Sequence, residues 1–422
     1  MPYDTSFAIA SVEAVHLAFK DSAGYWESYR SSEGGAQTDR FEFKPGWQTV
    51  YARYVETPLV KVTLSDGSTG WGEANCGIGP EVVCLLIEKV IAPMAVAPLT
   101  ALRQAQGAQG DGAPRLRSGR QGGREFGHPV ELWDFLYDAQ RGRGYSAGYY
   151  LDALAALDIA VWDALGKREG VPAAALLSSA PRRHIPVYLS GVRRNTVKER
   201  TEHLNSWLGR GLRGAKIFLT GDIDAGLREL DALQAGATGL EKWMVDTLWM
   251  CSFGAASLGK REFARRNVAF FECPLQPEDL KGHQRLLALP GAPIALGEHF
   301  RTHYQVEQWL EAPRALDVYQ PDIGRTGISD YVRQLEAATA AGIPVTPHMG
   351  TGVSVFQAAT LQCAALASPE LLQEFQGGLS DKLGQASDSA WTYRDGAFNL
   401  PDRPGIGVTL DETCMQRYIV RR

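Results

Sequence analysis

The sequence predicts an α/β protein built around a closed, TIM-type β/α barrel, and two observations lead to this fold class. Six polar residues end short apolar runs in the second half of the chain: Asp246, Glu272, Glu298, Asp322, His348 and Glu374. Neighbours in this series stand 26, 26, 24, 26 and 26 residues apart, which is room for one strand, one loop and one helix per step. In addition, eight candidate strands follow Pro181 at near-regular intervals. Eight such units favour a closed parallel barrel over an open sheet.

The N-terminal region predicts an antiparallel meander. Residues 9–20 and 50–64 alternate apolar and polar side chains, as half-buried strands do. An Asp-Gly pair at 66–67 predicts a hairpin turn into the run GWGEA. The intervening stretch, 21–48, is rich in Gly, Ser and aromatic residues and is too long for a simple hairpin loop. Its aromatic side chains either pack on the protein or line a substrate pocket, and they include Trp26, Tyr29 and Trp47.

Helical periodicity appears twice before the barrel. Residues 80–95 predict one helix, and the stretch from Pro129 to Lys167 predicts a longer helical region whose last part should be deeply buried. Gly170 and Pro172 end it. Between the two helical regions, 104–124 is rich in Gly, Gln and Arg, which predicts a flexible surface insertion.

The barrel strands are predicted from apolar runs of strand length. They cover residues 184–190, 214–219, 243–247, 268–273, 293–298, 317–321, 343–347 and 371–376. Amphipathic segments such as 196–211 and 328–342 predict the helices between them. After about residue 380 the alternation stops, and turns with short strands are expected to return to the N-terminal meander.

Composition and charge argue against a nucleic-acid-binding, membrane-spanning or disulfide-rich protein. A net charge of −5 over 422 residues gives no electrostatic reason to expect nucleic acid or an anionic membrane as partner. No apolar stretch approaches the ~20 residues that a membrane span needs, and no signal peptide is evident. The six cysteines form no C-x-x-C pair, which favours buried thiols in a reducing compartment over disulfides or a zinc framework. We therefore expect a cytoplasmic enzyme or binding protein.

Three of the polar residues predict a metal site. In a β/α barrel the ends of consecutive strands converge at one rim, so Asp246, Glu272 and Glu298 should lie close together. Three carboxylates at such distances repel one another unless a cation neutralises them. Oxygen ligands alone suit a hard divalent ion, with Mg²⁺ favoured and Mn²⁺ possible. The alternative is that each carboxylate pairs with a Lys or Arg, which would be favoured for any one of them alone; three acids in register favour the metal.

The next two strand ends predict a proton-transfer pair. Asp322 beside His348 would fix the histidine tautomer and stabilise its imidazolium form, which makes a competent general base. On the opposite side, Lys216 ends the second strand and suits acid/base or oxyanion work.

Several segments resemble signature segments of the enolase superfamily, mandelate racemase subgroup (mandelate racemase/muconate lactonizing enzyme-like proteins). They are GLRGAKIF, WMVDT, FFECPL, ALGEHF, QPDIGRTGI, VTPHMGTG and LLQEF, and the helix at 153–172 and the tail at 399–410 resemble the family too. The resemblance implies an α+β capping domain, 1–145 completed by 381–422, over a modified barrel, 146–380. It also implies that the reaction begins by removing a proton α to a carboxylate, with Mg²⁺ stabilising the enediolate.

Carried over by position, the resemblance assigns roles to individual residues. It makes Asp246, Glu272 and Glu298 the metal ligands, and Asp322 with His348 the acid/base dyad. Glu374 then corresponds to the acid that hydrogen-bonds the substrate carboxylate or the enediolate, and Lys216 to an electrostatic assistant.

One position departs from the family pattern. The K-x-K motif at the end of the second strand reads Lys216-Ile217-Phe218, and a phenylalanine neither donates nor accepts a proton. Racemisation through an enediolate needs proton delivery from both faces, whereas dehydration does not. The sequence therefore predicts a Mg²⁺-dependent hydro-lyase that converts an aldonate or aldarate to a 2-keto-3-deoxy acid. The alternatives are a racemase, epimerase or cycloisomerase of a related carboxylate, and a sugar-acid binding protein without turnover.

Substrate contacts are less well defined by the sequence. We expect them from the stretch 21–48 and from His299 and Arg301, which follow the fifth strand. Arg301 either binds a distal substrate carboxylate bidentately or forms a surface ion pair. Relatives commonly assemble as homo-oligomers, so a homo-oligomer is expected.

Overall fold

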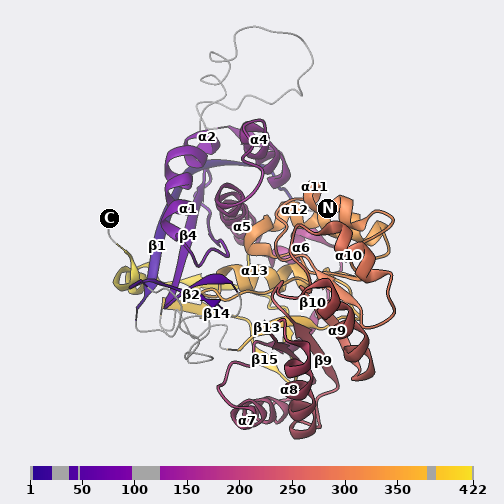
Figure 1. The fold of residues 1–422 in the computed structure, drawn as a ribbon. Coiled ribbons are helices and arrows are strands. Elements are labelled where there is room, and N and C mark those ends of the chain that lie inside the picture. The colour runs from indigo at the N-terminus through magenta and orange to yellow at the C-terminus, as the bar shows by residue number, and fades with distance from the viewer. Residues whose placement is uncertain (1–2, 21–37, 46–47, 97–123, 378–385, 421–422) are drawn as a thin grey trace.

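The computed structural model describes residues 3–20, 38–45, 48–96, 124–377 and 386–420. It contains an N-terminal capping domain and a TIM-type barrel, and the long helix α5 (Tyr149–Glu169) lies between them (Figure 1). The predicted fold class is confirmed, while the residue boundaries of the two domains stay a prediction. In the described part of the chain, no helix is long and apolar enough to cross a membrane.

The capping domain is built on an antiparallel sheet in the order β5-β4-β1-β6, as the predicted meander required. Its strands are β1 (Phe7–Phe19), β4 (Val55–Leu64), β5 (Thr69–Glu73) and β6 (Glu125–Phe126). Gly67, with a φ of 90°, makes the turn from β4 to β5. The helices packed around this sheet are α1 (Pro80–Leu86), the π-helical turn Ile87–Ile91, α2 (Ala92–Val96) and α4 (Pro129–Arg141).

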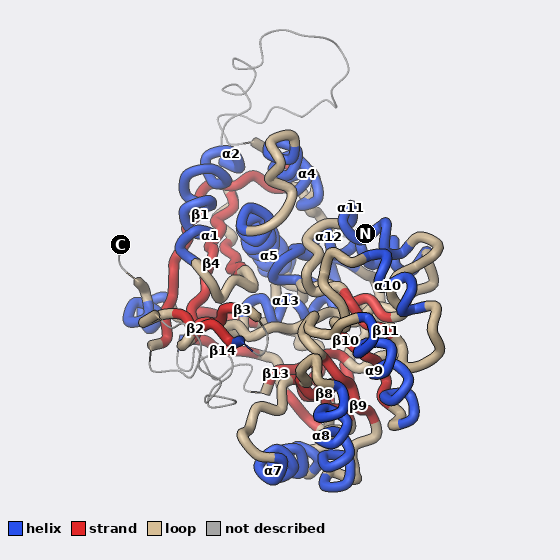
Figure 2. The backbone as a smooth tube through the Cα atoms, in the orientation of Figure 1, coloured by secondary structure: helices blue, strands red, loops and turns tan. Residues whose placement is uncertain are grey.

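The prediction of one continuous strand over 50–64 is wrong. The chain breaks at Arg53 and Tyr54, because the first part pairs with an earlier strand instead of with β1. That pair is the hairpin of β2 (Phe41–Lys44) and β3 (Thr49–Ala52), so the stretch 21–48 is not loop throughout. Figure 2 shows the hairpin as two short strands below the capping sheet, and β3 reaches the cavity described below.

The barrel contains the parallel strand order β7-β8-β9-β10-β11-β12, and β13 pairs with β7 on its other side. The strands are β7 (His184–Ser190), β8 (Gly214–Phe218), β9 (Lys242–Asp246), β10 (Val268–Glu272), β11 (Ile294–Leu296), β12 (Val318–Tyr319) and β13 (Gln373–Gln376). Tyr188, Met244 and Phe270 pack together in a small apolar cluster of their own. Met244 and Phe270 each lie two residues before the carboxylate that ends their strand, and the period of two places both on the same strand face as that carboxylate.

The seventh predicted strand, 343–347, is not a strand. Only isolated parallel bridges link it to its neighbour, from Val345 to Tyr319 and from His348 to Asp322. The physical reason is that Pro344 and Pro347 have no N–H to donate to a ladder.

Seven helices follow the barrel strands in sequence. Within the described part of the chain they are α7 (Val197–Leu208), α8 (Ile223–Gly236), α9 (Phe253–Arg265), α10 (Leu280–Leu287), α11 (His303–Leu310), α12 (Ile323–Ala340) and α13 (Val355–Ala364). Helix α7 begins with a capping box in which the side chains of Thr196 and Glu199 each bind the other's backbone N–H. Helix α12 is kinked at Gly327, which has a φ of 74°.

Helix α5 fits directly onto the backbone of β5. A Cβ added at Gly72 would lie 1.8 Å from the carbonyl oxygen of Ala156, and one at Gly70 would lie 2.0 Å from that of Ala160. Only glycines allow so close an approach of helix and strand. The helix is buried over most of its surface and ends at Gly170 in the left-handed conformation, both as predicted.

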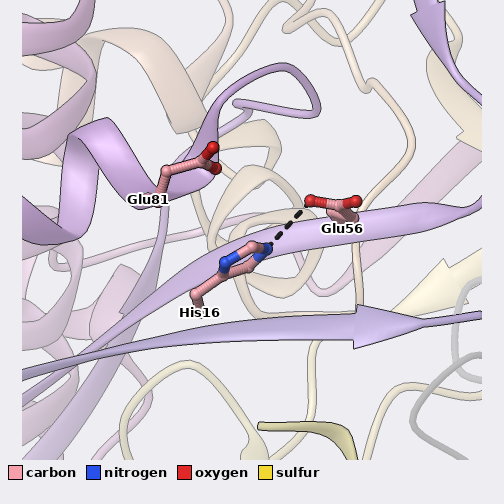
Figure 3. Close-up of side chains that lie close together, drawn as sticks. All are labelled: His16, Glu56 and Glu81. Atoms are coloured by element: carbon pink, nitrogen blue, oxygen red, sulfur yellow. Dashed lines mark hydrogen bonds and ion pairs between the residues drawn. The ribbon is translucent and has the colours of Figure 1, made fainter. Parts of the chain in front are cut away.

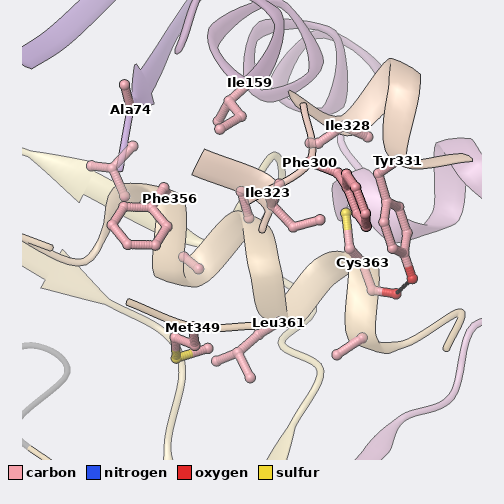
Figure 4. Packing of buried hydrophobic residues seen from close by; sticks show 14 of the residues in the cluster. Ala74, Ile159, Phe300, Ile323, Ile328, Tyr331, Met349, Phe356, Leu361 and Cys363 are labelled. Carbon is pink, nitrogen blue, oxygen red and sulfur yellow. Dashed lines mark hydrogen bonds between the residues drawn. The ribbon is translucent and has the colours of Figure 1, made fainter. Parts of the chain in front are cut away.

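Helix α5 also packs against the barrel. Figure 4 shows Ile159 of α5 above Ile323 and Ile328 of α12 and Phe356 of α13. In the same core, the Tyr331 hydroxyl donates a hydrogen bond to the Cys363 carbonyl at 3.1 Å. All six cysteines are free thiols, and all but Cys414 are buried. A short helix, α6 (Ala173–Leu177), connects α5 to β7.

The C-terminal tail contacts both units. The strands β15 (Tyr393–Arg394) and β16 (Ala397–Asn399) extend the barrel sheet at β7. The strands β14 (Ser387–Ser389) and β17 (Val408–Leu410) pair with each other and precede α14 (Glu412–Met415) and a 3₁₀ turn (Gln416–Tyr418). The expected return to the meander occurs at the chain end, where the Val420 N–H donates to the His16 carbonyl at 2.9 Å.

Candidate active site

The structure brings the six polar residues of the 26-residue series to one rim of the barrel. Asp246 and Glu272 end the neighbouring strands β9 and β10 and are paired in register. His348 forms a bridge with Asp322, and Glu374 lies in β13. Asp246, Glu272, Asp322 and Glu374 are almost fully buried, and the side chains of His348 and Glu298 are 11% and 19% exposed. The convergence follows from the shared direction of parallel strands.

The carboxylates form two overlapping groups that share Glu272. Oxygen atoms of Glu272 and Glu298 and a nitrogen of His348 lie within 4.8 Å of one another. Oxygen atoms of Asp246 and Glu272 and the sulfur of Cys273 do the same. Burial raises the pKa of Asp246 well above its usual value, and the charge of Glu272 adds to this. Burial likewise raises the pKa of Glu272, although Lys216 acts in the opposite direction.

This donor set fits a hard divalent cation. Asp246 and Glu272 supply carboxylate oxygens from the ends of β9 and β10, and Glu298 supplies them from the turn after β11. Burial and the charge of Glu272 both raise the pKa of Asp246, and a bound cation would favour its ionised form. Oxygen-only donors of this kind suit Mg²⁺ or Mn²⁺.

Lys216 is buried between two acids. Its Nζ lies 2.6 Å from Oε1 of Glu272 and 2.9 Å from Oε1 of Glu374. Burial alone would lower the pKa of Lys216, but these two carboxylates raise it well above its usual value. The other oxygen of Glu374 accepts a hydrogen bond from the Met349 N–H at 2.9 Å. Burial would raise the pKa of Glu374, yet Lys216 and His348 lower it, so this acid is held ionised.

His348 is oriented from both sides of its ring. Its Nδ1 lies 2.6 Å from Oδ2 of Asp322, and its Nε2 lies 2.8 Å from Oε2 of Glu298. Burial alone would lower the pKa of His348, but Glu298 and Glu374 raise it well above its usual value. Burial would raise the pKa of Glu298, and the neighbouring His348 instead lowers it. Asp322 and His348 therefore form the predicted contact.

Three further residues contact these polar residues, and none of them was predicted from the sequence. The Asn75 amide, from the capping domain, donates to Oδ2 of Asp322 at 2.6 Å. The Trp249 indole N–H points at Oε1 of Glu298 at 3.4 Å, and Arg325 donates to the Glu298 carbonyl at 3.1 Å. Asn75 lies 247 residues before its partner, so no local spacing could have revealed it.

A cavity of about 550 Å³ opens over this constellation between the two units. Its barrel side includes Glu298, Arg325 and His348. Its capping side is lined by Gln48, Thr49, Val50, Tyr51, Ala52, Tyr54, Val55, Glu56, Asn75, Gly77 and Ile78. A volume of this size accommodates a small organic ligand.

Phe218 forms part of an apolar wall near this cavity. It is buried and packs with Tyr51, Leu248 and Met250, all three of which line the cavity. A side chain without ionisable groups therefore stands at the position where the family pattern has its second lysine.

Behind the capping side lies a charged cluster that includes Glu56. His16 Nε2 lies 2.9 Å from Oε2 of Glu56, and Figure 3 shows this pair with Glu81 nearby. The Arg40 guanidinium bridges Glu56 and Glu81 at 2.6 and 2.9 Å. Burial would raise the pKa of Glu56, but hydrogen bonds from His16 and Arg40 lower it to about 2. Arg40 thus anchors the start of the β2–β3 hairpin to the capping sheet.

The predicted substrate contacts have different surroundings. The Arg301 guanidinium pairs with Asp152 of α5 at 2.9 Å and also donates to the His299 carbonyl, so its donors are engaged within the protein. His299 packs edge-on against Trp249 and lines a second, more open hollow between α10 and α11. Burial lowers the pKa of His299 to about 3. Trp26, Tyr29 and Trp47 lie outside the described residues.

Comparison with known families matches residues 199–414 to the family described as enolase C-terminal domain-like. A curated relative, a D-galactarolactone cycloisomerase from Agrobacterium fabrum (strain C58), is 28% identical over 375 residues, 85% of this chain and 90% of the relative. An arabinonate dehydratase from Saccharolobus solfataricus is 25% identical over 372 residues, 86% of this chain and 91% of the relative.

A solved structure extends the likeness to the whole chain. A member of the enolase superfamily from Agrobacterium tumefaciens superposes with a TM-score of 0.85 at 29% sequence identity. The match covers 99% of this chain and 100% of that one. The capping domain and the barrel therefore occur together in that protein as they do here.

Proposed function

Because the chain belongs to the enolase superfamily, whose members in this group act on small carboxylates, we propose that it dehydrates a sugar acid. The substrate class is an aldonate or aldarate, and the product is a 2-keto-3-deoxy acid. The observation that carries this proposal is the position of His348. It lines the cavity with its ring held by Asp322, while the second-lysine position is Phe218.

Asp246, Glu272 and Glu298 would hold a Mg²⁺ ion, with Mn²⁺ as the alternative. When bound, the ion neutralises negative charge that develops on the substrate carboxylate. The chain's own contribution is to present three carboxylates from rigid strand ends. Trp249 and Arg325 hold Glu298 in place from either side.

The proton chemistry falls to His348. Its Nε2, which here lies 2.8 Å from Oε2 of Glu298, would leave that contact to take the α-proton, because Nδ1 is committed to Asp322, whose own position is fixed by Asn75. The resulting imidazolium would give that proton to the departing β-hydroxyl, which leaves as water. The C–H and C–O bonds break, a C=C bond forms, and the enol product tautomerises to the 2-keto acid.

The surroundings of Lys216 support chemistry on one face of the substrate. Its ammonium is ion-paired with both Glu272 and Glu374 and does not line the cavity, as His348 does, so it is a weak candidate for a second base. Lys216 would instead act electrostatically. Glu374, which its contacts hold ionised, positions Lys216 and has no proton to donate while that ion pair persists.

The cavity's capping side suits a polyhydroxylated substrate. Gln48, Thr49 and Tyr51 carry groups that both donate and accept hydrogen bonds, as recognition of sugar hydroxyls requires. Arg301 is paired with Asp152, which favours its ion-pair role over recognition of a distal carboxylate.

A second candidate function is cycloisomerisation of a sugar lactone or anhydro sugar acid. The observation that favours it is the similarity to the Agrobacterium fabrum cycloisomerase over 90% of that relative. The same base would remove the α-proton, and a ring oxygen would depart in place of a hydroxyl. No water is released in that reaction.

Both functions are tested by one experiment. The protein is incubated with Mg²⁺ and panels of aldonates, aldarates and their lactones in deuterated water, and the products are followed by semicarbazone absorbance and NMR. A 2-keto-3-deoxy acid from an open-chain acid supports dehydration. Ring opening of a lactone without such a product from open-chain acids supports cycloisomerisation. Inversion at Cα with deuterium uptake and no keto acid would reject both in favour of epimerisation.

Two further expectations stay predictions. Five of the six thiols are buried and none is in a disulfide, which is compatible with a cytoplasmic location. Assembly as a homo-oligomer can be tested by sedimentation of the purified protein.

A further inference from the structure

Cys273 stands beside the candidate metal site in an unusual backbone conformation. It directly follows Glu272, and regular strand alternation would turn successive side chains to opposite faces. Instead, Cys273 has a φ of 50°, in the left-handed region that non-glycine residues seldom adopt. Its sulfur consequently lies within 4.8 Å of carboxylate oxygens of both Asp246 and Glu272.

The peptide around Cys273 is fixed by hydrogen bonds that leave the thiol itself uncommitted. Its carbonyl accepts from the Thr247 hydroxyl at 3.1 Å and from the Trp249 N–H at 2.7 Å. The side chain is 1% exposed, and within the described part of the chain no hydrogen bond of its sulfur is found. A backbone conformation of this kind costs of order 1–3 kcal/mol and persists at functional sites because surrounding contacts impose it.

We propose that Asp246, Glu272 and Cys273 form a mixed oxygen–sulfur site that takes a thiophilic divalent cation such as Zn²⁺, Cd²⁺ or Co²⁺. A thiolate and two carboxylates supply three of the four positions that zinc prefers. On binding, the sulfur–metal bond forms and the thiol proton passes to solvent. The inference rests on the proposed metal-binding role of Asp246 and Glu272.

The two cation sites cannot be filled together. Glu272 lies in both of the observed groups, and Asp246 would serve both sites if it binds Mg²⁺ as proposed, whereas Glu298 would serve only the oxygen site and Cys273 only the mixed site. Magnesium has little affinity for sulfur, so it takes the oxygen site, and a thiophilic ion is drawn to the sulfur side. The relative concentrations of the two kinds of cation would then decide which site is filled. A thiophilic ion in the mixed site would displace Mg²⁺ from the oxygen site.

The probe for this site is Co²⁺, added to the full-length, chelator-treated protein. Thiolate ligation gives a sulfur-to-cobalt charge-transfer absorption in the near ultraviolet, which oxygen ligation does not. We expect this absorption in the wild type and in the control variant Cys363→Ser, because Cys363 is a buried residue of α13 and no member of the proposed site. We expect it to be absent in Cys273→Ser, and added Mg²⁺ should diminish it in the wild type.

Affinity provides the second measurement. Calorimetric Zn²⁺ affinity should fall about 10- to 100-fold in Cys273→Ser, and Mg²⁺ affinity should change little. Circular dichroism of both cysteine variants identifies a folding failure, and Cys273→Ala then repeats the test. Equal Co²⁺ absorption in the wild type and Cys273→Ser, or Co²⁺ binding to the wild type without that absorption, would overturn the proposal.

One variant distinguishes failure of this inference from failure of the proposed function. Glu298→Gln removes a ligand of the oxygen site only, so its cobalt–sulfur absorption should persist while its Mg²⁺ affinity falls. If the wild type shows the absorption but binds no Mg²⁺, the mixed site stands and the magnesium-dependent function is rejected.

Discussion

Two sets of buried acids in this protein have opposite surroundings. The joint acids are Glu73, Asp158 and Asp163, which connect the capping domain and α5 to the barrel and the tail. The site acids are Asp246, Glu272, Glu298 and Glu374 at the barrel rim. Glu73 accepts from the Thr57 hydroxyl at 2.7 Å and from backbone N–H groups of α13 and the residues before it at 2.9–3.1 Å. The site acids face one another, Lys216 and His348, and two of them, Asp246 and Glu374, also accept from one backbone N–H each.

The different partners indicate different roles: the joint acids hold parts of the fold together, and the site acids are available for binding and catalysis. Asp158 accepts from the N–H groups of Ile328 and Ser329, and Asp163 accepts from those of Trp71 and Ile406. Backbone N–H donors are fixed in position, so these acids join elements that are far apart in the sequence. The site acids pack closely with one another and with Lys216 and His348, and close packing of like charges favours the binding of a cation.

The largest effect should come from the base that the site acids surround. His348→Asn should lower turnover by about 10²- to 10⁴-fold or more, because the α-proton loses its acceptor. Calorimetric Mg²⁺ affinity should remain, since His348 is not a proposed ligand. His184→Asn, at an exposed histidine, is the matched control. Retention of most activity in His348→Asn would remove it from the base role.

The second largest effect is expected when one of the proposed metal ligands, Glu298, loses its charge. Glu298→Gln should weaken Mg²⁺ binding by about 10- to 100-fold, because an amide oxygen is a poorer ligand than a carboxylate. Glu73→Gln is the matched control from the joint acids and should bind Mg²⁺ like the wild type. Equal affinities in all three proteins, measured by calorimetry, would contradict the assignment of Glu298.

The free energy of unfolding, unlike Mg²⁺ affinity, should respond to substitution of a joint acid. Glu73→Gln places an amide NH₂ against N–H donors, so we expect it to lower the free energy of unfolding by about 1–3 kcal/mol. Glu412→Gln, at a half-exposed carboxylate paired with Lys61, should change it by about 0–1 kcal/mol. Urea titrations of the three proteins make the comparison, and an unchanged midpoint for Glu73→Gln would mean that this acid does not join the two units.

Stability should also depend on pH through the joint acids. Burial raises the pKa of Asp158 to about 7 from 3.8, although Ser329 and Ile328 favour its ionised form. The folded protein therefore keeps a proton that the unfolded chain releases, and stability falls as pH rises from about 3.8 to about 7. One such group changes the free energy of unfolding by at most about 1.4 kcal/mol per pH unit. Asp158→Asn should flatten this fall, and identical slopes would contradict the shift.

The sequence predicted best those features that repeat along the chain. β7 to β10 begin and end within one residue of their predicted bounds, because apolar runs and polar strand ends recur together. The strand expected at 343–347 failed because Pro344 and Pro347 cannot donate to a ladder, which the apolar pattern does not reveal. The break at Arg53 was equally hidden, since it depends on which distant strand β3 pairs with.

The same distinction holds within the candidate site. Spacing predicted that Asp246, Glu272 and Glu298 converge at one rim, and Glu272 lies in one group with Asp246 and in another with Glu298. Their partners could not be predicted, because contacts such as Asn75 with Asp322 come from the other unit. The joint acids were also missed. Asp158 and Asp163 occur within an apolar helix, where the pattern alone gives no indication of which amides they meet.

Replacement of the site acid Asp246 should raise the free energy of unfolding, whereas replacement of the joint acid Glu73 should lower it. Asp246 lies buried beside Glu272, and both burial and that charge raise its pKa. Asp246→Asn removes the repulsion, so the cation-free protein should become more stable by about 0.5–2 kcal/mol, as is common when a functional charge is removed. Chelator-treated samples compared by thermal melting test this, with Mg²⁺ raising the melting temperature of the wild type but not of the variant. A loss of stability as large as that of Glu73→Gln would place Asp246 among the joint acids and break the distinction between the two sets.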